Sequence, residues 1–139
     1  MIVGDGNIKD DLEKKSHEWG LEYNISFCGM QKDVVPFLSK ASIFILPSVD
    51  EGMPIAILEA MRQGLPVVST RVGGIPFQVI DKVTGVLIDA STEGVVNFIE
   101  HIDEYNWVEM GRADRDRYLN EFSIEQMIEK YAEILKEVN

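Results

Sequence analysis

Residues 50–60 read Asp-Glu-Gly-Met-Pro-Ile-Ala-Ile-Leu-Glu-Ala and combine a tight turn, a helix start and two acids. The apolar run Ile43–Leu46 precedes them and predicts a strand buried on both faces of a parallel sheet. Glu51 then falls in the loop after this strand, and Glu59 falls inside the following helix. In open α/β folds, ligands bind at this carboxyl edge of the sheet. Helix N-termini attract phosphates, and carboxylates accept paired hydrogen bonds from vicinal hydroxyls. The segment therefore predicts a ligand with a diphosphate and sugar hydroxyls.

Outward from this segment, strand and helix signals alternate over residues 1–90. The expected strands are Met1–Val3, Asn24–Cys28, Ile43–Leu46, Pro66–Ser69 and Gly85–Ile88. The expected helices are Ile8–Trp19, Val34–Lys40, Pro54–Gln63 and Pro76–Ile80. This alternation predicts an α/β fold with a Rossmann-like parallel sheet and helices on both faces. We expect a single domain over residues 1–139, with the βα core in 1–90 and a helical extension in 91–139.

The extension is expected to contain only helices. Apolar residues recur there at helical spacing and predict faces that pack into the core. They are Val95, Val96, Phe98, Ile99 and Ile102, then Ile124, Met127, Ile128, Tyr131, Ile134, Leu135 and Val138. Ser123 is the expected N-cap of the last helix, with Gln126 as its capping-box partner. Between these helices, Trp107 is expected to face inward.

Composition narrows the classes of partner. The 139 residues carry a formal net charge of −11, which argues against nucleic acid as a partner because its binding depends on Lys and Arg contacts to phosphate. The single cysteine, Cys28, excludes an internal disulfide and agrees with a cytoplasmic location. No apolar run approaches the roughly 20 residues of a membrane-spanning helix. Because the first expected strand is very short, we expect the sequence to be part of a longer protein.

Three glycine turns are further candidates for ligand contact. Gly4-Asp5-Gly6 either lets the backbone approach a ligand closely or forms an ordinary turn. Gly29, followed by Met30, either frees backbone groups to read a base or simply ends a strand. Gly73-Gly74 follows the Pro66–Ser69 strand at the same sheet edge, so we expect it next to the Glu51 loop, where it forms either an anion-binding nest of N–H groups or a flexible turn.

Charged residues near the predicted site are also candidates for ligand contact. Glu59 lies in a helix that is apolar on almost every side, so it is expected to be partly buried and to need a partner. Glu51 is either a ligand contact or a solvated loop acid. Arg71 and Arg62 are candidate phosphate partners, although Arg62 could instead pair with Glu59 on the helix surface.

These motifs together resemble the donor-binding, C-terminal domain of group-1 GT-B glycosyltransferases. The matching segments, over residues 1 to about 90, are Gly4-Asp5-Gly6-Asn7, Phe27-Cys28-Gly29, Pro47–Gly52, Glu59-Ala60-Met61, Gly64–Val67, Gly73–Phe77 and Thr84–Leu87. The resemblance implies sugar transfer from a nucleotide-diphosphate sugar with retention of configuration, to a glycan or lipid-linked acceptor. The sugar would be a hexose or an N-acetylhexosamine. No cofactor and no metal is implied.

The resemblance also implies a role for individual residues. Glu59 matches the acid that holds the ribose hydroxyls, and Glu51 matches the acid near the transferred sugar, so both are assigned as catalytic. The remaining donor-binding residues are Gly4, Gly29, Met30, Gly52, Met53, Pro54, Gly73 and Gly74. Phe77 stands where the family usually has glutamate, so this loop departs from the family's pattern.

The family's basic pair on the diphosphate and its acceptor-binding domain find no match in the sequence. The chain alone is therefore expected not to turn over, and the full enzyme could associate peripherally with a membrane. Two alternatives remain open. One is a nucleotide-sugar epimerase of the same architecture. The other is a phospho-acceptor receiver module, in which Asp5, Asp50 and Glu51 would bind Mg²⁺.

Overall fold

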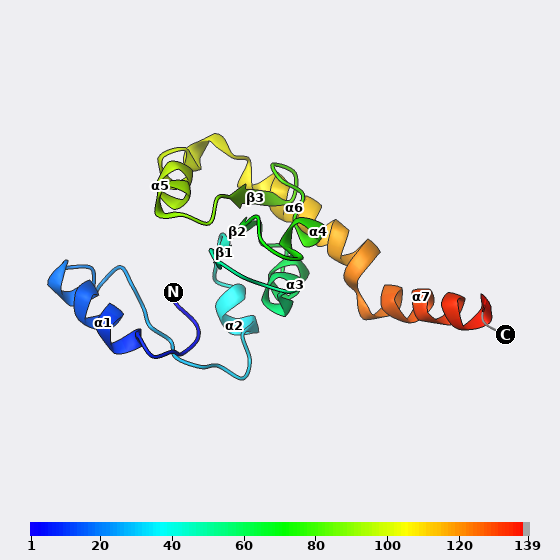
Figure 1. The fold of residues 1–139 in the computed structure, drawn as a ribbon, viewed down its shortest axis with the longest axis horizontal. Helices are drawn as coiled ribbons and strands as arrows, with labels where there is room; N and C mark the ends of the chain where they lie inside the picture. The colour runs from blue at the N-terminus through cyan, green and yellow to red at the C-terminus, as the bar shows by residue number, and fades with distance from the viewer. Residues whose placement is uncertain (138–139) are drawn as a thin grey trace. The chain divides into compact units, whose positions relative to one another are not determined.

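The computed structural model describes residues 1–137 and divides the chain into two compact units, Met1–Lys40 and Ala41–Asn139. The first unit contains α1 (Lys9–Glu18) and α2 (Val35–Leu38), both labelled in Figure 1. Helix α1 is stabilised by ion pairs one turn apart, Lys9–Glu13 and Lys14–Glu18. Its end is marked by Gly20 with φ +67°, as the sequence predicts.

The first two predicted strands are reduced to a single contact. Ile2 and Phe27 form an isolated parallel bridge, supported by the bonds from Ile2 N to Ser26 O and from Cys28 N to Ile2 O, both 2.8 Å. The prediction of full strands at Met1–Val3 and Asn24–Cys28 was therefore wrong. Met1–Val3 is three residues long and exposed, so it cannot support a longer ladder.

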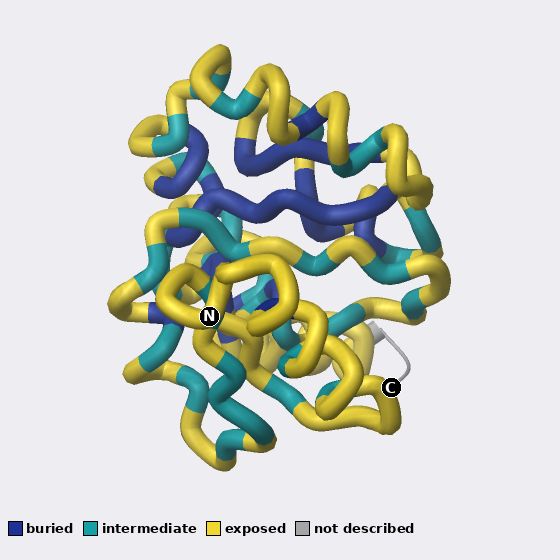
Figure 2. Tube along the Cα trace, turned by 90° about the vertical axis from the view of Figure 1, so that its left-hand side faces the viewer, coloured by how far each residue is buried: buried dark blue, intermediate teal, exposed yellow. Residues whose placement is uncertain are grey.

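The second unit is built on a parallel sheet of three strands in the order β1-β2-β3. These are β1 (Phe44–Leu46), β2 (Val67–Thr70) and β3 (Gly85–Ile88), with Val68 opposite both Ile45 and Val86. Strands β2 and β3 are buried along their whole length (Figure 2). Strand β1 was also expected to be buried on both faces, but Ile45 is 52% exposed. Within this sheet β1 is an edge strand, so it lacks a neighbour on one side.

The helices of this unit alternate with the strands and then follow β3. They are α3 (Ile55–Arg62), α4 (Ile75–Gln78), α5 (Thr92–Glu100), the 3₁₀ turn η1 (Ile102–Glu104), α6 (Trp107–Arg117), the π-helical turn η2 (Tyr118–Phe122) and α7 (Ile124–Glu137). Helix α3 contacts β1 and β2, while α5 and α6 contact β3. Ser91 caps α5 through Gly94 N at 3.0 Å, and Asn106 caps α6 through Glu109 N at 3.2 Å.

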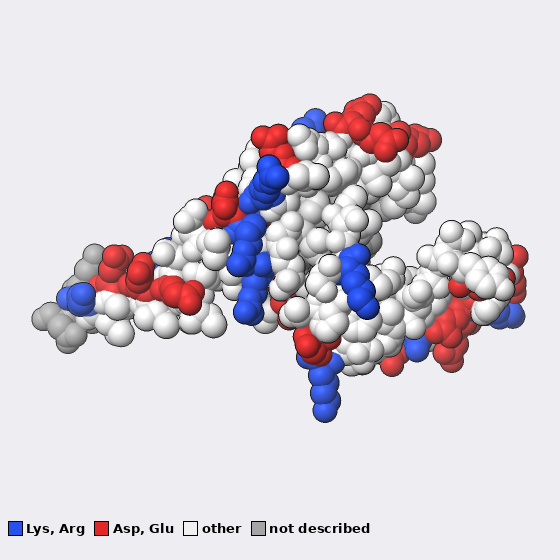
Figure 3. Space-filling model, turned by 180° about the vertical axis from the view of Figure 1, so that it is seen from behind, with Lys and Arg blue, Asp and Glu red and all other residues white. Residues whose placement is uncertain are grey.

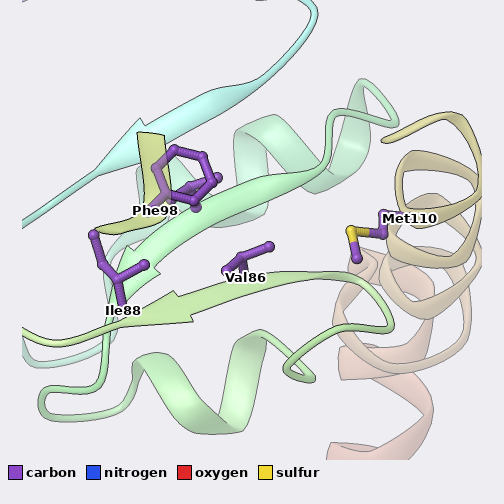
Figure 4. Packing of buried hydrophobic residues seen from close by; sticks show 5 residues of the cluster. Val86, Ile88, Phe98 and Met110 are labelled. Carbon is purple, nitrogen blue, oxygen red and sulfur yellow. The ribbon is translucent and has the colours of Figure 1, made fainter. Parts of the chain in front are cut away.

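One cluster of the hydrophobic core lies between β2, β3, α5 and α6. Its buried members are Val68, Val86, Ile88, Phe98 and Met110. Figure 4 shows Phe98 from α5 and Met110 from α6 beside the strand residues Val86 and Ile88. Trp107 packs against this cluster, as predicted, and donates its Nε1–H to Ile102 O at 2.9 Å. The predicted apolar face of α5 is only partly used, because Val96 and Ile99 are exposed.

Helix α7 departs from the expectation of a core helix. Its N-cap is confirmed, since Ser123 Oγ accepts from Gln126 N at 3.3 Å, but the Gln126 side chain bonds Glu129 instead of completing the capping box. The apolar stripe is exposed at Ile124, Met127, Ile128, Tyr131, Ile134 and Leu135; Val138 lies outside the described residues. Figure 3 shows acidic side chains beside uncharged ones along this helix. The periodicity predicts the helix correctly, but α7 packs mainly on η2, so the stripe stays uncovered.

Within residues 1–137, no helix is long and apolar enough to cross a membrane.

Candidate functional site

The ends of β1 and β2 are joined by side-chain hydroxyls. Ser69 Oγ donates to Leu46 O at 2.6 Å, and the Thr70 hydroxyl donates to Ser48 O. Both hydroxyl residues are buried at the end of an apolar strand, where an unbonded hydroxyl would be costly. These bonds place the loop that follows β1 beside the loop that follows β2. Sequence reasoning missed this role, although two hydroxyl residues ending a buried strand are a visible signal.

The glycine pair after β2 packs directly on the loop after β1. A Cβ built on Gly73 would lie 1.6 Å from Glu51 O, and one built on Gly74 would lie 2.4 Å from Gly52 O. Gly73 also has φ +51°, the left-handed conformation that glycine tolerates best. The prediction that the glycine pair lies next to the Glu51 loop is therefore confirmed, and both positions require glycine.

Of the two interpretations of this pair, the nest of free N–H groups is wrong for Gly74. Gly74 N donates to Gly52 O at 2.6 Å, so this N–H is already bonded within the chain. The hydrogen bond forms because the backbones of Gly74 and Gly52 approach each other closely. The glycine pair thus holds the Glu51 loop, and its Gly74 N–H is not free for an anion.

Helix α3 begins directly after this loop. Pro54 is its N-cap residue, with φ −67° and ψ 123°, and Gln78 Nε2 donates to Pro54 O at 3.1 Å. Gly52 and Met53, just before it, are exposed. The segment Glu51–Pro54 is therefore fixed from several sides while its surface is open to solvent, which is a suitable arrangement for binding a ligand at a helix N-terminus.

The two glutamates differ in their surroundings. Glu51 is half-buried, and its Oε1 accepts a hydrogen bond from Ser48 Oγ at 2.8 Å. Glu59 was expected to be partly buried, but it is exposed. The reason is the direction of the helix faces: α3 buries Ile57, Ala60 and Met61, which form one stripe, and Glu59 lies on the opposite side. Its carboxylate can therefore accept hydrogen bonds from a ligand without first losing a protein partner.

The candidate arginines are engaged elsewhere or face solvent. Arg71 forms an ion pair with Asp81 Oδ2, and Asp81 Oδ1 accepts from Leu87 N at 2.9 Å, so Arg71 is bonded beside β3. Arg62 is exposed, and among residues 1–137 it forms no ion pair with Glu59. Over the same residues, no three His, Cys, Asp or Glu side chains are grouped so that they could hold a metal ion.

In the first unit, two of the predicted donor-binding glycines are adjacent. Gly4 N donates to Gly29 O at 2.9 Å, with φ +138° at Gly4 and +64° at Gly29. Asp5 Oδ1 accepts from Gly6 N at 2.8 Å, which makes this a bonded turn. Met30 is 73% exposed, so its side chain is free to meet a ligand.

A buried acid that sequence reasoning did not single out lies on α6. Asp114 is fully buried, and burial raises its pKa from 3.8 to about 8. The Thr84 hydroxyl and the Arg117 guanidinium oppose this rise. The Thr84 hydroxyl lies close enough to the Asp114 carboxyl to lower its pKa. Within the described residues, however, neither oxygen of the Asp114 carboxyl has a hydrogen-bond partner of normal geometry. The charged surroundings of Asp114 in sequence give no sign of its burial.

Comparison with known proteins identifies the family. The model of "Glycosyl transferases group 1" matches residues 1–105. The chain belongs to this family. This group-1 chain is 33% identical over 137 residues to the lipopolysaccharide core biosynthesis glycosyltransferase LpsE of Rhizobium meliloti. The match covers 96% of the chain and 40% of LpsE. The resemblance seen in the motifs is thus confirmed.

A second curated relative and a solved structure are also similar to the group-1 chain. It is 28% identical to the UDP-Gal:alpha-D-GlcNAc-diphosphoundecaprenol alpha-1,3-galactosyltransferase of Escherichia coli, over 96% of the chain and 35% of that protein. Among solved structures, Anabaena Alr3699/HepE in complex with UDP matches with a TM-score of 0.83 and 24% identity, over 97% of the chain and 40% of HepE. The predicted α/β fold of a GT-B glycosyltransferase is confirmed. The chain spans well under half the length of these proteins.

Proposed function

We propose that this chain binds the nucleotide-diphosphate sugar donor of a group-1 glycosyltransferase. The donor would lie at the segment Glu51–Pro54 and the glycine pair Gly73-Gly74 of the second unit. For Gly4, Gly29 and Met30, which belong to the first unit, donor contact stays a prediction from the sequence. The observation that carries this proposal is the close packing of the glycine pair on the loop that begins α3. Family membership supports a transferase over an epimerase or a receiver module.

The two glutamates would recognise the sugar parts of the donor. The exposed carboxylate of Glu59 is available to accept two hydrogen bonds from ribose hydroxyls. The carboxylate of Glu51 is held by Ser48, so it offers a fixed acceptor for hydroxyls of the transferred sugar. The N-terminus of α3 would face the diphosphate, where its dipole favours negative charge.

The reaction of the full enzyme would be retaining transfer of a hexose or N-acetylhexosamine. As the bond to the sugar breaks, charge grows on the leaving diphosphate, and N–H groups already oriented toward it stabilise that charge. The acceptor would be a glycan or a lipid-linked sugar bound by another part of the enzyme, in the cytoplasm and with peripheral contact to a membrane. The E. coli relative, named for UDP-Gal and a diphosphoundecaprenol acceptor, supports this proposal. The chain by itself would bind donor without turnover.

Calorimetry of the 139-residue chain against UDP, UDP-galactose and free galactose tests the proposal. We expect UDP and UDP-galactose to bind and galactose alone not to bind. Glu59→Gln should weaken UDP binding by about tenfold, because hydrogen bonds to a charged group are commonly worth about 1.5–3 kcal/mol. Glu100→Gln, which changes an exposed acid at the end of α5, is the matched control and should leave affinity unchanged.

Absence of binding to UDP, UDP-galactose and the corresponding purine nucleotide diphosphate sugars would refute the proposal. Equal affinity of the wild-type chain and Glu59→Gln would refute the role given to Glu59 alone. Multiple turnover by the purified chain would contradict the expectation that it lacks activity by itself.

A further inference from the structure

The C-terminus of α4 is bonded by an arginine from a distant helix. Arg117, the last residue of α6, donates from Nε to Gln78 O at 3.1 Å and from Nη2 to Phe77 O at 2.9 Å. The last carbonyls of a helix have no partner within the helix, and a cation there also complements the helix dipole. Arg117 thus caps the C-terminus of α4 by bonding Gln78 and Phe77, which lie 39 and 40 positions before it in the sequence.

The guanidinium is itself held in place by η2. Arg117 Nη2 lies 3.0 Å from Glu121 Oε2, and its Cζ lies 5.5 Å from the centre of the Phe122 ring. The Arg117 side chain is only 18% exposed, so these interactions are partly shielded from water. A guanidinium with an ion pair, a ring contact and two carbonyl bonds has little freedom to move.

The other contacts of α4 lead to the proposed donor site. Gln78 is fully buried: its backbone carbonyl accepts from Arg117, and its side-chain Nε2 donates to Pro54 O at 3.1 Å. Its Oε1 has no hydrogen-bond partner among the described residues. At the opposite end of α4, Gly74 N donates to Gly52 O. Helix α4 is therefore bonded at one end to Arg117 and along its length to the two residues that flank Met53.

We propose that Arg117, acting through Gln78 and α4, is a positioning residue for the donor-binding segment Glu51–Pro54. Its link to donor affinity rests on the proposed function; its effect on the geometry of this segment does not. Arg117 touches neither Gly52 nor Pro54 directly, so its influence passes through the backbone of α4 and the side-chain amide of Gln78. Without it, α4 would be freer to shift away from Gly52 and Pro54.

Amide hydrogen exchange followed by NMR in the ligand-free chain tests the positioning itself. Arg117→Ala should speed exchange of the Gly74 amide by about tenfold, the change that loss of one hydrogen bond to a charged group commonly produces. Arg112→Ala is the matched control, because Arg112 is an exposed arginine on the same helix. Amides of β2 report global opening, so the rise at Gly74 in Arg117→Ala should exceed any rise at β2 in the same variant.

Gln78→Met provides a second variant in case Arg117→Ala does not fold. It keeps the backbone carbonyl of residue 78, which Arg117 bonds, and removes the side-chain amide that donates to Pro54 O. Exchange at Ile57, whose N–H bonds Pro54 O at 3.2 Å, should rise in this variant. Unchanged exchange at Gly74 in Arg117→Ala, or at Ile57 in Gln78→Met if only that variant folds, would overturn the proposal.

Binding of UDP-galactose then measures the consequence for the site. We expect Arg117→Ala to weaken binding by about tenfold and Arg117→Lys to recover part of the loss, since lysine keeps the charge but not the planar fork. Arg112→Ala should bind as the wild type does. Wild-type affinity in Arg117→Ala would overturn the link to the donor. A wild-type chain that binds no nucleotide would refute the proposed function, while the exchange data would still decide whether Arg117 positions the segment.

Discussion

Asp114 makes the stability of this chain depend on pH in an unusual direction. In the unfolded chain its pKa is the ordinary 3.8, and burial raises the pKa to about 8 in the folded chain. Between these two values the folded chain holds a proton that the unfolded chain releases, so folding is favoured by acid. The contribution is fully present below the unfolded pKa and is lost as pH rises toward the folded pKa.

The magnitude follows from the difference in bound protons. With one proton more in the folded state, the free energy of unfolding falls by about 1.4 kcal/mol for each pH unit between the two pKa values. Asp114→Asn keeps the size of the side chain and removes the titration. The stability of the variant relative to the wild type should therefore rise by about 3 kcal/mol from pH 5 to pH 7.

Urea denaturation followed by circular dichroism at pH 5, 6, 7 and 8, at constant ionic strength, measures this difference. Asp116→Asn removes an exposed carboxyl two residues further along α6 and controls for the loss of an acid from this helix. Taking the difference between Asp114→Asn and wild type cancels the other titrating groups. A difference that stays constant from pH 5 to pH 7 would refute the reasoning, because it would mean that Asp114 titrates alike in the folded and unfolded chains.

Three further substitutions test the packing that supports the site. Gly73→Ala should lower the free energy of unfolding by about 1–3 kcal/mol, because its Cβ would meet Glu51 O at 1.6 Å. Gly52→Ala, which has open space at its Cβ, should lower it less, and equal losses in urea titrations of the two variants would contradict this. Phe98→Ala should cost about 3–5 kcal/mol in the same assay, since the ring fills the core beside β3, and a loss below about 1 kcal/mol would argue against that burial. Ser91→Ala should cost about 1 kcal/mol through loss of the α5 cap, with Ser91→Asn near wild type; equal stability of both variants would show that the cap contributes nothing.

Local signals in the sequence predicted the elements that form the centre of the fold. Strand β3 begins and ends where predicted, and β2 and α3 do so within one residue at each end. Apolar runs between glycine and proline signals are strong enough for this, because they describe local conformation. The motif Glu51–Glu59 also located the loop and helix of the candidate site, and the positions of the two glutamates on them, correctly.

Burial was predicted less well, because it depends on which neighbours each element meets. Glu59 appeared to be surrounded by apolar residues in sequence, yet α3 buries only the stripe of Ile57, Ala60 and Met61. Ile45 is exposed because β1 is an edge strand of the three-stranded sheet. The apolar stripe of α7 is exposed for a similar reason: a periodic pattern says that a face is apolar and does not say what covers it.

The sequence alone determined the alternation of strands and helices, the parallel α/β architecture and the family, because each is encoded in residues close together in the chain. Only the tertiary structure decided that Gly73 packs so closely on Glu51 that a Cβ would not fit, that Arg117 bonds the end of α4 and that Asp114 is buried beside Thr84. These contacts join residues that lie about 20–40 positions apart. Such pairs leave no local pattern, since their meeting depends on how the whole sheet and its helices are assembled.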